Sequence, residues 1–277
     1  MISTAAEPDT ATQAHRAGQF PAIDIRDLSL TFRTADGTVD ALSHVDLSVG
    51  MGEFVSFIGP SGCGKTTLMR VIADLERQTE GEIRVNGLSP EDNRRARGYG
   101  YVFQAPALYP WRSIERNVML PLEIIGLPKA ERKARASAQL EAVGLSGFAR
   151  KFPWQLSGGM QQRVSIARAL AFEPGLLLMD EPFGALDEIT RDHLNEVLLK
   201  LWAATGKTVI FVTHSISEAV FLSTRIVVMS PRPGRIVEVI DCDLGPERPL
   251  EIRESQKFLD IAQKVRLALK AVHSYDD

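Results

Sequence analysis

Apolar residues in the N-terminal part of the chain fall in short runs separated by polar turns. Between residues 23 and 49 these runs follow one another closely, a pattern typical of antiparallel strands at the edge of a domain. The runs at residues 55–58, 176–179, 208–213 and 226–229 are apolar at almost every position. Because a strand that is buried on both faces has no polar side, such runs predict the strands of a parallel sheet.

Helical spacing dominates other parts of the chain. Residues 66–75 follow the first apolar run and a glycine-rich loop, and apolar side chains in residues 194–201 recur at i, i+3, i+4 and i+7. Between residues 105 and 165 strand signals fade and charged helical patterning appears, which predicts a helical subdomain inserted into an α/β core. A last helix is expected to pack back on its own domain, with partner binding as the alternative. Its apolar face contains Phe258, Ile261, Val265, Leu269 and Val272.

Composition narrows the class of protein. Of the 277 residues, 44% are hydrophobic and 24% charged, which is ordinary for a globular protein, and the net charge of −3 argues against a nucleic-acid-binding surface. We find no apolar run of about 18 residues that would predict a membrane-spanning helix. Residues 1–20 lack the apolar core of a secretory signal and predict a disordered leader.

The string GPSGCGKTT at residues 59–67 fits the spacing of a phosphate-binding loop between a strand and a helix. Glycines let backbone N–H groups approach phosphate oxygens, and the helix N-terminus adds partial positive charge. Lys65 offers a full charge to the β and γ phosphates, and the Thr66 hydroxyl suits Mg²⁺. A flexible turn is the alternative, which the flanking strand and helix disfavour. The predicted ATP-binding residues here are Gly59, Pro60, Ser61, Gly62, Cys63, Gly64, Lys65, Thr66 and Thr67.

The two cysteines, Cys63 and Cys242, are too few for a disulfide framework and fit a reducing, intracellular compartment. Cys63 occupies a variable position of the phosphate loop, so we expect it to lie close to bound phosphates. A thiol reagent that reacts with Cys63 would then block ATP binding.

A second motif, LLLMDEP at residues 176–182, places two carboxylates after a buried strand. Asp180 is positioned to hold Mg²⁺ through water, and Glu181 to orient or deprotonate an attacking water molecule. An acidic pair after a strand is often only a helix cap, so this motif depends on the phosphate loop for its interpretation.

The string LSGGMQQR at residues 156–163 places a serine and two glycines at the start of a predicted helix, which makes a second anion-binding N-terminus. This octet resembles the signature motif of ABC-type ATPases. The resemblance implies that two copies pack head to tail and trap two nucleotides between them, each signature holding the γ phosphate of ATP on the other subunit. An ordinary serine-capped helix is the alternative. The residues concerned are Ser157, Gly158, Gly159 and Gln161.

The other elements of the ABC-type pattern follow in the expected order. Gln104 resembles the Q-loop glutamine that joins Mg²⁺ and the γ phosphate to the helical subdomain, and Asp187 ends a D-loop that crosses to the partner. His214, after a buried strand, resembles the switch histidine. Phe32 resembles the aromatic residue that stacks on adenine, although an aromatic residue in a strand is more often part of the core. The resemblance implies catalytic roles for Glu181, His214 and Gln104, and metal-binding roles for Thr66, Gln104 and Asp180.

The resemblance covers residues 23–236 and implies a P-loop NTPase core. Its parts are a mostly parallel sheet, an N-terminal antiparallel β subdomain and the inserted helical signature subdomain. The ATPase domain then spans residues 21–240, and residues 241–277 form a tail with an amphipathic helix. The implied cofactors are ATP and Mg²⁺.

Three stretches resemble importers of nitrate, sulfonates, taurine and thiamine-pyrimidine precursors: EPFGALDEITR (181–191), THSISEA (213–219) and PRPGRI (231–236). This implies an ATPase homodimer at the cytoplasmic face of the membrane that works with transmembrane permease subunits and, indirectly, an extracytoplasmic solute-binding protein. Residues 105–111, rich in apolar residues and proline, are the candidate dock for the permease. A packed loop within the subdomain is an equally favoured alternative.

The main rival is a soluble ABC-type ATPase that acts on cytosolic partners in translation, DNA repair or cofactor assembly. Translation factors of the family usually carry two ATPase units and repair proteins a long coiled coil, and this sequence has neither feature. The signature octet argues against a P-loop kinase. Glu181 and His214 argue against a nucleotide sensor without activity.

Overall fold

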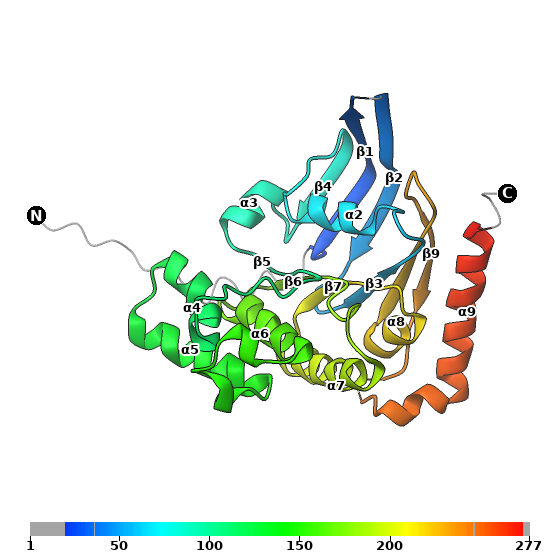
Figure 1. Cartoon of the computed structure of the whole chain (residues 1–277). Helices are drawn as coiled ribbons and strands as arrows, with labels where there is room; N and C mark the ends of the chain where they lie inside the picture. The colour runs from blue at the N-terminus through cyan, green and yellow to red at the C-terminus, as the bar shows by residue number, and fades with distance from the viewer. Residues whose placement is uncertain (1–19, 36, 246, 274–277) are drawn as a thin grey trace, which may run out of the picture.

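Two sheets organise the described residues, which are 20–35, 37–245 and 247–273 (Figure 1). In this computed structural model the predicted leader at residues 1–20 lies, except for Phe20, outside that part of the chain. The strands are β1 (Ile23–Thr34), β2 (Gly37–Val49), β3 (Phe54–Ile58), β4 (Glu80–Val85), β5 (Tyr99–Val102), β6 (Leu176–Asp180), β7 (Thr208–Val212), β8 (Arg225–Met229) and β9 (Ile236–Asp241). The helices are α2 (Lys65–Ile72), α3 (Pro90–Arg95), α4 (Ile114–Ile125), α5 (Lys129–Ala142), α6 (Gly158–Leu170), α7 (Glu188–Thr205), α8 (Ile216–Leu222) and α9 (Gln256–His273). Short 3-10 turns are η1 (Ser146–Phe148), η2 (Pro153–Gln155) and η3 (Leu250–Glu254).

The smaller sheet is antiparallel and has the strand order β2-β1-β4. Its pairing runs from Ile23 opposite Val49 to Thr34 opposite Gly37, which confirms the antiparallel strands predicted between residues 23 and 49. The strand β4 adds to the free side of β1 and was not singled out from the sequence.

The larger sheet has the order β5-β6-β7-β3-β8-β9 and is parallel except for β9, which pairs antiparallel to β8. It contains all four runs predicted as buried strands. Along β3 the period of two sends Val55 and Phe57 into one apolar cluster and Phe54 and Ile58 into another. Both faces are therefore covered, which is why these strands carry no polar side.

Each face of the larger sheet has its own cover (Figure 1). The helix α2 and the smaller sheet pack on one face, and α7, α8 and α9 pack on the other. The helices α4, α5 and α6 share a third apolar cluster, as expected for the predicted helical subdomain. No helix among the described residues combines the length and apolarity needed to cross a membrane.

The C-terminal helix α9 packs on its own chain, as its spacing predicts. Phe258, Ile261, Val265 and Val272 are all buried, and the first three belong to the cluster that contains β6, β7 and β8 side chains. Leu269 is partly buried against the same cluster.

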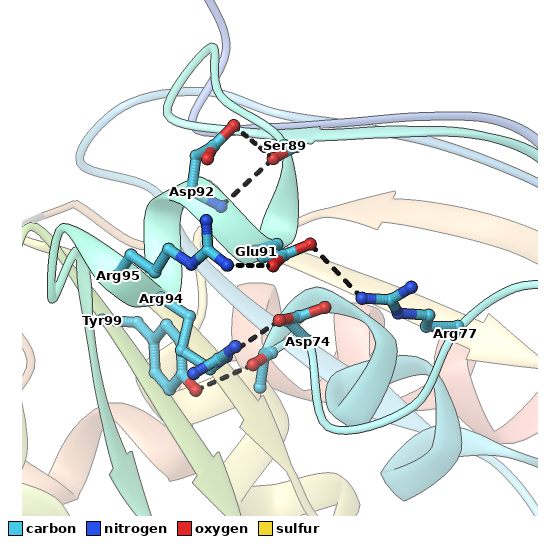
Figure 2. Close-up of polar contacts among 9 residues, drawn as sticks. Asp74, Arg77, Ser89, Glu91, Asp92, Arg94, Arg95 and Tyr99 are labelled. Atoms are coloured by element: carbon cyan, nitrogen blue, oxygen red, sulfur yellow. Dashed lines mark hydrogen bonds and ion pairs between the residues drawn. The ribbon is translucent and has the colours of Figure 1, made fainter.

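A polar cluster joins the end of α2 to α3 and β5 (Figure 2). Asp74, just after α2, accepts from Nε of Arg94 at 2.8 Å, and the Tyr99 hydroxyl donates to the Ala73 carbonyl at 2.8 Å. Ser89 caps α3 by accepting from the Asp92 N–H at 3.1 Å. These contacts fix the far end of the helix that begins at the phosphate loop.

Arg248 holds the tail to the core, which generates a prediction about stability. Arg248 is 6% exposed, and its guanidinium donates to the carbonyls of Phe221 and Ser223, both at 2.8 Å. Arg248→Ala would leave these carbonyls unsatisfied and lower the free energy of unfolding by about 2 kcal/mol. We expect thermal unfolding about 5 °C below that of the unaltered chain, measured by circular dichroism. The control Arg266→Ala removes an exposed arginine of α9 and should change little. Equal stability of the two variants would contradict this account.

Candidate functional site

The phosphate loop predicted at residues 59–67 connects β3 to α2. Gly62 and Gly64 have positive φ angles of 75° and 103°, which glycine adopts without the cost that a side chain would impose. A Cβ on Gly64 would also lie 2.8 Å from Leu42 Cδ2. The glycines are thus required both for the turn and for its close packing on β2.

Lys65 lies inside this loop. Its side chain is almost fully buried, and its ammonium donates to the carbonyls of Gly59 at 2.9 Å and Pro60 at 2.8 Å. The loop therefore curls around a full positive charge at the start of a helix, where the backbone N–H groups of the first turn have no helical partner. This donor set fits the phosphate groups of a nucleotide. Ser61 and Gly62 form the exposed rim of the loop.

The burial of Cys63 bears on the expectation that a thiol reagent would react with its sulfur. Its side chain is 1% exposed and packs into the apolar cluster beneath the loop, together with Leu68 and Met69. Block of ATP binding by a thiol reagent would require a sulfur that the reagent can reach. Because the backbone of residue 63 follows the loop while its side chain turns inward, selective labelling of Cys63 is no test of ATP binding.

Thr66 and Asp180 meet although 114 positions separate them. The Thr66 hydroxyl donates to Oδ1 of Asp180 at 2.9 Å, and the Tyr101 hydroxyl lies 3.4 Å from Oδ2. Burial raises the pKa of the Asp180 carboxyl, and the Thr66 hydrogen bond partly offsets this rise. A partly desolvated carboxylate beside a hydroxyl is the kind of oxygen pair that holds Mg²⁺ together with phosphate oxygens. Tyr101 was not predicted as a site residue.

Glu181 and His214 form the second pair. Oε1 of Glu181 lies 2.6 Å from Nε2 of His214, and both side chains line a cavity of about 380 Å³. Gln104 reaches this cavity from the segment after β5, so the three predicted catalytic side chains share one space. The cavity is lined by Gln104, Glu181, Gly184, Arg191, Thr213, His214, Ser215 and Glu218.

The signature residues begin α6, as predicted. The Ser157 side chain is the N-cap and accepts from the Met160 N–H at 3.3 Å, and Gln161 donates to the Leu156 carbonyl at 3.1 Å. Ser157 and Gly158 are exposed, whereas a Cβ on Gly159 would lie 2.5 Å from Thr190 Cγ2. The signature therefore packs on the start of α7 and presents its serine to solvent in the single chain.

Asp187 and Phe32 occupy separate parts of the fold. Asp187 is the N-cap of α7 and accepts from the Thr190 N–H at 2.9 Å, a bond that lowers the pKa of this carboxyl. Phe32 lies on β1 and is half-buried against the cluster that includes Cys63.

Four side chains that line the cavity were not predicted from the sequence: Arg191, Thr213, Ser215 and Glu218. Glu218 is 5% exposed although it is charged, and Arg191 lies 3.4 Å from it. Glu218 and Arg191 both lie within stretches that carried the family resemblance, but nothing in those stretches indicates that the two side chains meet. Their pairing depends on how α7 packs beside α8, which no local pattern gives.

Comparison with known proteins agrees with this geometry. The family model described as ABC transporter matches residues 42–184. The chain is 46% identical to a taurine import ATP-binding protein from Rhizobium johnstonii, over 87% of this chain and 92% of the relative. It is 43% identical to an aliphatic sulfonates import ATP-binding protein from Bacillus cereus, over 88% of this chain and 94% of the relative.

Solved structures give the same result. The chain resembles a dimeric ATP-binding cassette in a post-hydrolysis state bound to ADP and Pi, with a TM-score of 0.71 and 36% identity over 79% of this chain and 98% of that one. The matched family model spans over half of the chain and the relatives align along most of their length. The chain therefore belongs to the ABC transporter family and is one of its ATP-binding, ATP-hydrolysing subunits.

Proposed function

We propose that two copies of this chain hydrolyse ATP to power uptake of a small solute of the nitrate or sulfonate type through a separate membrane permease. The observation that carries the proposal is the contact of Glu181 with His214 at 2.6 Å. The preceding residue, Asp180, contacts Thr66, so the two pairs lie next to each other. One pair suits the activation of water, and the other suits Mg²⁺ beside the phosphates.

Each residue then has a distinct task. The loop residues 59–67 bind the phosphates, and Phe32 stacks on adenine. Glu181 orients water and accepts its proton, while His214 holds the Glu181 carboxylate in place. Thr66, Asp180 and Gln104 would hold Mg²⁺, which neutralises phosphate charge when bound.

The second copy completes each site. Ser157 is exposed at a helix N-terminus, and its side chain accepts a hydrogen bond from the Met160 N–H of its own helix. An exposed helix N-terminus of this kind supports binding of a γ phosphate across a head-to-tail dimer. Asp187 and the rest of the D-loop would lie at the same interface. The similar cassette of known structure is described as dimeric.

The similarity to import ATP-binding proteins supports uptake as the direction of transport. The taurine and aliphatic sulfonates import proteins align with nearly the whole chain, and no specific observation favours an ATPase that acts on cytosolic partners. We therefore place the chain at the cytoplasmic face of the membrane, with transmembrane permease subunits and, indirectly, an extracytoplasmic solute-binding protein as partners.

The permease dock is proposed at residues 105–111. Trp111 is 70% exposed and its ring lies 5.1 Å from that of Tyr109. Next to Tyr109 lies a cavity of about 330 Å³ with an apolar lining that includes Ile124 and Phe172. Exposed aromatic side chains beside an apolar hollow are typical of protein interfaces.

Glu181→Gln tests the assigned catalytic carboxylate. We expect ATP turnover to fall by roughly 100- to 10,000-fold, because an amide cannot accept the proton of water, while ATP binding persists. Mg-ATP should therefore trap a dimer, detected by size-exclusion chromatography. Glu141→Gln, at an exposed position of α5, is the control and should behave as the unaltered chain. A Glu181→Gln variant that stays monomeric with Mg-ATP would count against the head-to-tail dimer.

Ser157→Arg tests the signature in trans. The added side chain would fill the space of the partner's γ phosphate without touching the phosphate loop of its own chain. ATP affinity of the monomer should be unchanged and hydrolysis should drop roughly 100-fold or more. Ser137→Arg, on the exposed side of α5, is the matched control. Full hydrolysis by the Ser157 variant would show that the second anion site is not used.

Trp111→Ser tests the permease dock and the transporter role. The unaltered chain, captured by a tag from gently solubilised native membranes, should bring along a polytopic membrane protein in near-equal amount, identified by mass spectrometry. Trp111→Ser should lose this partner yet keep its ATPase activity, because the exposed ring lies outside the hydrolysis cavity. The control Leu267→Ser removes an exposed apolar side chain of α9 and should retain the partner. Capture of cytosolic proteins alone would argue against a transporter.

A further inference from the structure

Glu218 is a buried carboxylate that has no task in the mechanism proposed above. It lies in the first turn of α8 and is 5% exposed, yet its side chain lines the hydrolysis cavity. Burial raises the pKa of this carboxyl, and contacts with Thr213 and Arg191 oppose the rise. A charged group is kept at such a position only where its partners compensate for the lost water.

On one side Glu218 holds the turn that carries His214. Its Oε2 accepts a hydrogen bond from the Thr213 hydroxyl, and the same hydroxyl oxygen accepts from the Ser215 N–H at 3.0 Å. The Ser215 side chain in turn accepts from the Glu218 N–H at 3.2 Å. The residues before and after His214 are therefore both fixed to α8, which limits where the imidazole can point.

On the other side Glu218 faces the D-loop. Its Oε1 lies 3.4 Å from Nε of Arg191, and Nη2 of Arg191 donates to the Leu186 carbonyl at 2.8 Å. That Nε is buried without a hydrogen-bond acceptor within the described part of the chain, so the ion-pair contact with Glu218 is its electrostatic compensation. The Arg191 guanidinium therefore links the Glu218 carboxylate on α8 to the Leu186 carbonyl in the D-loop.

The charged residues Asp192 and Arg253, which lie near the Glu218–Arg191 pair, contact each other. Asp192, the next residue on α7, lies 2.7 Å from Nη1 of Arg253, and Arg253 also stacks over the Phe221 ring at 5.1 Å to its centroid. The carboxylate of Asp192 is therefore engaged by the C-terminal segment. Glu218 makes the ion-pair contact with Arg191, whose charge also acts on the Asp187 carboxyl at the end of the D-loop.

We propose that Glu218 and Arg191 are positioning residues that lock the His214 turn to the D-loop, residues 184–187. The lock holds the Glu181–His214 pair and the residues at the dimer interface in one arrangement, so that hydrolysis depends on both together. This inference rests on the proposed function, since it assigns the pair to ATP turnover. The phosphate loop is held by other contacts, and nucleotide affinity is independent of the lock.

The test compares Glu218→Gln, Arg191→Met and the double variant in the full-length chain. Each single variant should lower kcat roughly 10- to 100-fold, because a small displacement of reacting groups has effects of that size. The KM for ATP and the ATP dissociation constant should be unchanged. Because both residues act through one contact, the double variant should lose no more activity than the more impaired single variant.

The control Glu53→Gln breaks a comparable pair, in which Oε2 of Glu53 lies 3.0 Å from Nη1 of Arg225, away from the cavity. It should keep normal kcat. Because a change at a buried carboxylate can prevent folding, Arg191→Met provides the independent test, its side chain being 31% exposed. Normal kcat in Arg191→Met, independent losses that multiply in the double variant, or an equal loss in Glu53→Gln would each overturn the lock. An unaltered chain without ATPase activity would instead refute the proposed function.

Discussion

Parallel pairing among β3, β6 and β7 determines where the polar groups of the site lie. The register sets Asp180 opposite Val212, and Val212 opposite Phe57. The residues that follow each strand therefore emerge at the same edge of the sheet: the phosphate loop after β3, Glu181 after β6 and His214 after β7. Since these strands are apolar on both faces, a shift of register would bury polar groups without partners, and burial itself keeps the chemistry aligned.

The elements that the sequence predicted are those whose signals are local. A buried strand, a glycine-rich loop and a serine-capped helix each occupy a few consecutive residues, so GPSGCGKTT and LSGGMQQR predicted both their structure and their position. Arg248, Tyr101 and the pairing of Arg191 with Glu218 escaped prediction, because each acts through a contact between distant segments. The burial of the Cys63 sulfur was not predicted for a related reason, since the direction of a side chain in a loop depends on what packs beneath it.

The helix α6 connects the residues at its start, from Ser157 on, to the segment around Gln104. Its side chains enter both the subdomain cluster and the cluster on the central sheet. Gln162 donates to the Phe103 carbonyl at 3.2 Å, and the Arg168 guanidinium donates to the carbonyls of Pro106 and Ala107 at 2.8 and 2.7 Å. Both sides of Gln104 are thereby tied to the helix that begins at Ser157. A movement of the signature toward a partner's nucleotide would be transmitted to residues 105–111 as a rigid shift, because close-packed elements move as units.

Backbone strain at Glu181 supports a positional role for its carboxylate. This residue has a φ of 47°, a left-handed conformation that costs a non-glycine residue about 1 to 2 kcal/mol. The surroundings enforce it, since the Glu181 N–H donates to the Val212 carbonyl at 3.0 Å and its own carbonyl accepts from the Gly184 N–H at 3.2 Å. Glycine would relieve the strain but would remove the group that meets His214. The fold thus maintains an unfavourable backbone conformation at Glu181, where a sharp turn and a carboxylate that meets His214 are needed together, and this gives the strain a functional explanation.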